Sequence, residues 1–129
     1  MRALLLILLG LAIGAMGATA AISALRQGTP YHRGVMAVMQ HHMGVLRDHV
    51  RQGQCEATSI QKHLSHLSDG ARDIDEAFPS MDDGFYTAAR RLDSALDAAQ
   101  KAGPATCEAL AAALKPVGDA CQSCHQNFR

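Results

Sequence analysis

Four stretches of about 22 residues repeat apolar side chains at alternating spacings of three and four, and this pattern constrains the fold most. Such spacings place the side chains on one face of an α-helix, as a left-handed helical bundle requires of each member. The four faces are His32, Met36, Met39, Met43, Leu46 and Val50; Ile60, Leu64, Leu67, Ala71, Ile74 and Phe78; Phe85, Ala89, Leu92, Leu96 and Ala99; and Leu110, Leu114, Val117, Cys121 and Cys124.

Turn and cap residues separate the four stretches, and they predict where each helix begins and ends. Short connections between helices of similar length predict an all-α, antiparallel up-down-up-down four-helix bundle. The expected helices are residues 30–52, opened by Thr29-Pro30 and closed by Gly53; residues 56–78, stopped by Pro79; a third, from a capping box at Ser80-Met81-Asp82-Asp83 to Gly103-Pro104; and residues 107–129, capped by Thr106.

The first residues are not expected to belong to this bundle. Arg2 precedes an uncharged run over residues 3–25, and Ala18-Thr19-Ala20 offers small residues for cleavage. We interpret residues 1–20 as an export signal peptide. The alternative is an uncleaved membrane anchor that extends to about residue 25. In either case the domain at residues 29–129 is expected outside the cytoplasm, in the periplasm.

Charge excludes one class of partner. The chain has 12 Lys and Arg against 12 Asp and Glu, so it lacks the basic excess of a nucleic-acid-binding protein. Only 4% of the residues are aromatic. A core with so few large side chains leaves room for an apolar cofactor to supply bulk.

The ending CQSCH, residues 121–125, has the C-x-x-C-H spacing at which haem c is attached. Cys121 and Cys124 would form thioether bonds to one covalent haem, and His125 would be the proximal iron ligand. The alternatives are a Cys121–Cys124 disulfide, a thiol redox motif and a zinc ligand pair. A redox motif expects a βαβ context and zinc expects four ligands, so the sequence favours haem.

With this ending on the fourth helix of an exported bundle, the chain resembles the cytochrome c′ family. The ending continues as C-x-x-C-H-x-x-F-R, and Tyr31-His32-Arg33-Gly34-Val35-Met36 with His42-Met43-Gly44 fits the family pattern of the first helix. The resemblance covers about residues 29–129. It departs at His32, which stands where the family has an Arg that contacts a haem propionate.

The resemblance places Met36 at the distal side of the iron, as in the low-spin branch of the family. The topology agrees, because Met36 near the start of the first helix and His125 near the end of the fourth lie at the same end of the bundle. Met36 would then be the sixth iron ligand. The alternative is that Met36 is a core filler, as we expect of Met39 and Met43.

Two further residues are candidates for the surroundings of the haem. His32 lies one turn before Met36, so it could hydrogen-bond a propionate or, alternatively, replace Met36 as ligand. The resemblance implies a basic side chain at Arg129, near the proximal face. A solvated C-terminal Arg is the alternative.

The remaining cysteines are expected at the opposite end of the bundle. Cys55 and Cys107 precede or begin the second and fourth helices, which start at the same end in this topology. We predict a Cys55–Cys107 disulfide in an oxidising compartment, with two free thiols as the alternative.

Five histidines lie on the first two expected helices, at positions 41, 42, 49, 63 and 66. They suggest a copper or other transition-metal site, although a solvated surface is the favoured interpretation. The resemblance also implies a homodimer that forms through the first two helices.

Together these features predict a periplasmic monohaem cytochrome that passes electrons to redox partner proteins and is not an enzyme. Membrane contact is expected only if the N-terminal segment is retained. One alternative is a five-coordinate haem protein that binds nitric oxide or carbon monoxide. Another is a haem-free bundle that binds a transition metal.

Overall fold

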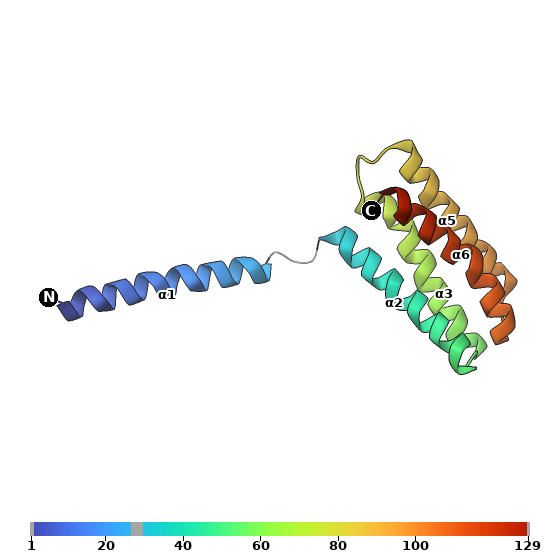
Figure 1. Ribbon diagram of the computed structural model, residues 1–129, viewed down its shortest axis with the longest axis horizontal. Helices are drawn as coiled ribbons and strands as arrows, with labels where there is room; N and C mark the ends of the chain where they lie inside the picture. Colours follow the sequence, from blue (N-terminus) through green and yellow to red (C-terminus); the bar gives the residue numbers. More distant parts are fainter. Residues whose placement is uncertain (1, 27–29, 129) are drawn as a thin grey trace. The chain divides into compact units, whose positions relative to one another are not determined.

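The computed structural model describes residues 2–26 and 30–128 and divides the chain into two units, Met1–Pro30 and Tyr31–Arg129. Thr29, expected to cap the first helix of the bundle, lies outside the described residues. The first unit holds helix α1 (Arg2–Arg26) (Figure 1). Its segment Leu6–Ser23 has a mean hydropathy of 2.0, so α1 is long and apolar enough to cross a membrane. A signal sequence near an N-terminus has the same properties.

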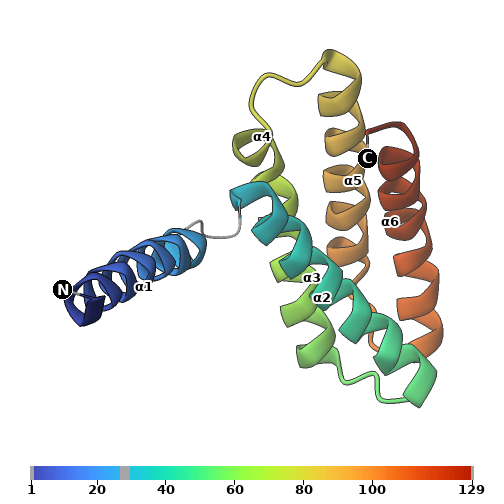
Figure 2. The same cartoon turned by 60° about the vertical axis from the view of Figure 1, so that its left-hand side comes forward.

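The second unit is an antiparallel four-helix bundle, which confirms the predicted fold class (Figure 2). Within the described residues it contains helices and no strand. Each long helix packs against two others, in the order α2, α3, α5, α6 and back to α2. Its elements are α2 (Tyr31–Gln52), α3 (Ala57–Arg72), the single turn α4 (Ile74–Ala77), α5 (Asp83–Ala102) and α6 (Cys107–Phe128).

Most of the core consists of the predicted apolar faces, but Val35 and Ala77 are also buried. Six predicted members are only half-buried: His32, Met36, Val50, Phe78, Cys121 and Cys124. Leu46 of α2, Leu96 of α5 and Leu110 of α6 have no exposed surface at all. Helices α2 and α3 approach closely at Gly70, where an added Cβ would lie 2.8 Å from Cγ of Met39. The absence of a side chain at Gly70 therefore lets the buried Met39 lie against the α3 backbone.

Three predicted helix ends are confirmed. Gly53 follows α2 with φ 68°, and Gly103 caps α5 with φ 52°, both in the left-handed region that glycine tolerates. The Oγ1 atom of Thr106 accepts a hydrogen bond from the Ala109 N–H at 3.2 Å, so Thr106 caps α6.

The expected helix over residues 56–78 is not continuous. Glu56 caps α3, its carboxylate accepting hydrogen bonds from the Thr58 and Ser59 N–H groups at 3.0 and 2.8 Å. Helix α3 then ends at Arg72, and α4 follows after Asp73. The ψ angle of Asp73 is −9°, about 30° away from the α-helical value, and the helix is interrupted there before α4 begins.

The capping box predicted at residues 80–83 was wrong, because the cap of α5 lies two residues after Ser80. Asp82 is the cap of α5, since its Oδ1 accepts a hydrogen bond from the Phe85 N–H at 2.8 Å. Ser80 instead takes a positive φ of 69° in the turn. A hydrogen bond from the Met81 N–H to the Tyr86 hydroxyl, 3.2 Å long, holds this turn against α5.

The structure joins Cys55 and Cys107, the pair expected from the sequence, in a disulfide with their Cα atoms 5.2 Å apart. This distance lies in the ordinary range for disulfides. The bond ties the start of α3 to the start of α6, two helices that lie diagonally across the bundle. It therefore closes the end of the bundle away from the C-terminus (Figure 2).

Candidate haem-attachment site

The two C-terminal cysteines lie one turn apart near the end of α6, and both are free thiols. Both are half-buried, and Cys121 packs against the core. Burial raises the pKa of the Cys121 thiol, although the nearby Arg47 charge opposes the increase. Burial also raises the pKa of Cys124. The sequence placed these cysteines on the buried face of α6, whereas the structure puts them at its edge, where a ligand can reach them.

His125 follows Cys124 directly, and its side chain is exposed. The last turn of α6 is held in place by Phe128, whose ring lies 5.5 Å from that of Phe85 in an edge-to-face contact. This contact anchors to α5 the turn that carries the C-x-x-C-H sequence.

An aromatic cluster occupies this end of the bundle. The Phe85 ring also contacts Phe78 at 5.2 Å, and Phe78 contacts the imidazole of His32 at 5.3 Å. The Tyr86 hydroxyl donates a hydrogen bond to the Phe78 carbonyl at 3.1 Å. All three phenylalanines of the chain thus lie together, and they hold the ends of α2, α4, α5 and α6 in contact.

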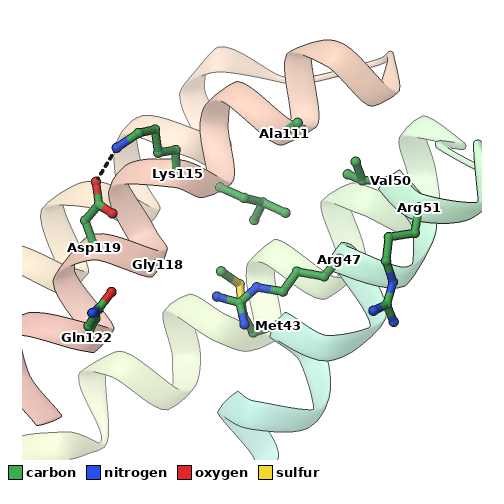
Figure 3. A pocket seen from close by; sticks show the side chains of 10 residues that line it. Met43, Arg47, Val50, Arg51, Ala111, Lys115, Gly118, Asp119 and Gln122 are labelled. Carbon is green, nitrogen blue, oxygen red and sulfur yellow. Dashed lines mark hydrogen bonds and ion pairs between the residues drawn. The ribbon is translucent and has the colours of Figure 1, made fainter.

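A groove of about 480 Å³ lies between α2 and α6 (Figure 3). The groove is open to solvent along one side, so it would cover only part of a ligand. The walls are partly apolar and carry three cations, of which Lys115 is paired with Asp119 at 2.8 Å and Arg51 with Asp48. The lining residues are Met43, Arg47, Val50, Arg51, Ala111, Leu114, Lys115, Gly118, Asp119 and Gln122.

The groove and the thiols are neighbours on α6, because Gly118 and Gln122 of its wall flank Cys121 in sequence. Arg47 reaches from α2 toward this point (Figure 3). A Cβ at Gly118 would lie 3.4 Å from Nη2 of Arg47 and 3.7 Å from Cε of Met43. The bare backbone at Gly118 thus allows the Arg47 guanidinium and the Met43 side chain to lie close to α6. Sequence reasoning missed Arg47, since only the helix register shows that it faces α6.

Met36 is half-buried in α2 and packs against the core. Its position near the start of α2 puts it at the end of the antiparallel bundle where α6 terminates. Met39 and Met43 are both buried, in agreement with their predicted role as core residues. The ring of His32 contacts that of Phe78, and Arg129 lies outside the described residues.

The histidines of α2 and α3 form a separate group. Nδ1 of His42 lies 2.8 Å from Nδ1 of His63, so one of the two nitrogens donates a hydrogen bond to the other. The pKa of each is lowered, first by burial and then by neighbouring charged side chains. The sequence predicted this gathering of histidines but not which pair would meet.

These observations together test whether this end of the bundle suits a covalent haem. Two unpaired thiols lie at the i, i+3 spacing, at the edge of the core rather than inside it. Near them are an apolar aromatic cluster, which suits a porphyrin, and the Arg47 guanidinium in the groove wall, which suits one of its carboxylates. The residues present therefore fit the group.

Comparison with known proteins gives one informative match. No protein-family model matches the chain, and no curated protein matches it significantly. Among solved structures, the crystal structure of cytochrome c′ from Rubrivivax gelatinosus is similar, with a TM-score of 0.67 and 20% sequence identity. The match covers 77% of this chain and 91% of that chain. The bundle therefore has the fold of cytochrome c′.

Proposed function

On the premise of this shared fold, we propose that the chain is a periplasmic monohaem c-type cytochrome that transfers electrons. The observation that carries the proposal is the pair of free, half-buried thiols of a C-x-x-C-H sequence beside the α2–α6 groove. Cys121 and Cys124 hold the haem covalently, and His125 is its proximal ligand. When bound, the haem supplies an iron centre that accepts and releases one electron.

Met36 is the distal ligand in this proposal. Its half-buried position near the start of α2 supports the role, because a thioether at this end of the bundle is shielded but not enclosed by the core. Ligation by His and Met raises the reduction potential and closes the iron to small ligands. The protein then acts on no substrate of its own, so it is a carrier and not an enzyme.

Arg47 takes the place of the arginine that the family has at the position of His32. Its guanidinium lies beside Gly118 and is near enough to affect the Cys121 thiol. A guanidinium pairs well with a carboxylate such as a haem propionate. His32, whose ring contacts Phe78, is the second candidate for this role.

The N-terminal helix supports export of the protein from the cytoplasm. The apolar segment of α1 is compatible with an export signal, as c-type haem attachment outside the cytoplasm requires. A retained α1 would instead anchor the cytochrome in the membrane. We also propose that the redox partners are other proteins and that the chain forms a homodimer through α2 and α3.

The direct experiment is the visible spectrum of the matured protein, recorded with and without carbon monoxide. The proposal predicts a low-spin haem spectrum that carbon monoxide does not change. Met36→Leu should convert this spectrum to a high-spin form that binds carbon monoxide, because the sixth ligand is lost. Met39→Leu is the matched control, since it also replaces a methionine of α2 but one buried against α3.

Other results assign the other functions. A high-spin spectrum in the unaltered protein, shifted by carbon monoxide, would indicate a five-coordinate haem that binds gases. A low-spin spectrum unchanged by Met36→Leu would place the sixth ligand elsewhere, with His32 the next residue to replace. A colourless matured protein would instead indicate the third function, a haem-free bundle that binds a transition metal.

A further inference from the structure

Five of the seven histidines of the chain gather where α2 and α3 pack together, away from the C-x-x-C-H sequence. His42 is at the centre of the group. Its ring lies 5.1 Å from that of His63, 4.6 Å from that of His66 and 5.0 Å from that of His41. His49 contacts the other side of the group, with its ring 5.9 Å from that of His63. The electron-transfer function uses none of these residues.

The His42 and His63 pair has nearly the spacing of two ligands on one metal ion. Their Nδ1 atoms are 2.8 Å apart and share a hydrogen bond. Two imidazole nitrogens at a metal–nitrogen distance of about 2.1 Å and a tetrahedral angle are about 3.4 Å apart. Widening the pair by about 0.6 Å therefore allows a metal ion to replace the shared proton.

His66 is the nearest source of a third ligand. It follows His63 by one turn, so both project from the same face of α3 toward α2. Its ring now stacks on His42 with an interplanar angle of 15°, and its side chain is exposed. Among the described residues, no three His, Cys, Asp or Glu side chains already converge on a metal position. Binding must therefore rotate His66 inward, which an exposed side chain allows.

We propose that His42, His63 and His66 form a binding site for one divalent transition-metal ion of the Zn²⁺ or Cu²⁺ class, independent of the haem. Neutral imidazole nitrogens suit these ions, and a three-histidine set leaves one position for water. The bound metal would join α2 to α3 near the middle of both helices. It would therefore stabilise the bundle by an amount that increases with the logarithm of the metal concentration above the dissociation constant.

The test is a calorimetric titration of the matured protein with Zn²⁺. Cys121 and Cys124 must be blocked, by haem or by alkylation, so that their thiols do not bind zinc. We expect one ion per chain, and at least about tenfold weaker binding in each of His42→Gln, His63→Gln and His66→Gln. Cu²⁺ electron paramagnetic resonance should then show nitrogen ligands that are lost in the same three variants.

Two matched controls use histidines of the same group. His41→Gln and His49→Gln should leave the affinity unchanged, because neither residue belongs to the proposed ligand set. Equal weakening in His41→Gln would indicate diffuse binding to surface histidines and would overturn the site. A loss confined to His49→Gln and His63→Gln, or one ion per two chains, would also refute it. Since blocked thiols suffice, the result does not depend on whether haem is bound.

Discussion

Breaking the Cys55–Cys107 disulfide should lower the free energy of unfolding substantially. The bond closes a loop with a sequence separation of 52 residues. The chain-entropy relation for a loop of this length gives about 4 kcal/mol at 25 °C, which arises because the unfolded chain regains freedom. For a domain of this size, that loss corresponds to a midpoint roughly 15–30 °C lower in thermal unfolding.

The assay is urea denaturation of the unaltered protein and of the double variant Cys55→Ala/Cys107→Ala, with and without a thiol reductant. Reduction should destabilise the unaltered protein to about the level of the variant, whereas the variant should not respond. Haem thioethers resist such reductants, so the comparison isolates this disulfide. A difference below about 1 kcal/mol would refute the reasoning, because it would mean that the unfolded chain gains little freedom.

Two further predictions concern local contacts. Gly70→Ala should destabilise the bundle by about 1–3 kcal/mol in urea denaturation, because the new Cβ would meet Met39 at 2.8 Å, whereas Gly44→Ala meets nothing within 4 Å and should be neutral or stabilising. Stabilisation by both would contradict the close approach. Hydrogen bonds from Thr58 and Ser59 lower the pKa of Glu56 below its ordinary value of 4.5, so its contribution is complete at neutral pH and is lost as the pH falls through the lowered pKa. Glu56→Gln should therefore lose less stability between neutral and acidic pH, and an unchanged pH profile would count against the cap.

Local signals in the sequence were sufficient for most helix ends and for the core. Gly53, Gly103 and Thr106 act through their own backbone conformation or hydroxyl group, so their roles do not depend on distant residues. The apolar faces of the helices also follow from spacing alone. The errors at Asp73 and Asp82 occur in the α3–α5 connection, where tertiary contacts of Phe78 and Tyr86 decide the conformation.

The site could be predicted only in part. The C-x-x-C-H sequence makes Cys121, Cys124 and His125 candidates by adjacency, but their exposure depends on how α6 is rotated against its neighbours. The approach of Arg47 to Gly118 and the pairing of His42 with His63 depend on the register between two helices. A single sequence without other information does not determine that register, because many side-chain pairings satisfy the same apolar pattern.

The intact mass of the matured protein tests the central claim most directly. The chain should be produced with the machinery that attaches c-type haem, then denatured and extracted to remove any unattached haem. We predict a mass that exceeds the polypeptide by one haem, and the loss of this increment in Cys121→Ser/Cys124→Ser. A mass equal to that of the bare polypeptide would contradict the proposal that this bundle is a c-type cytochrome.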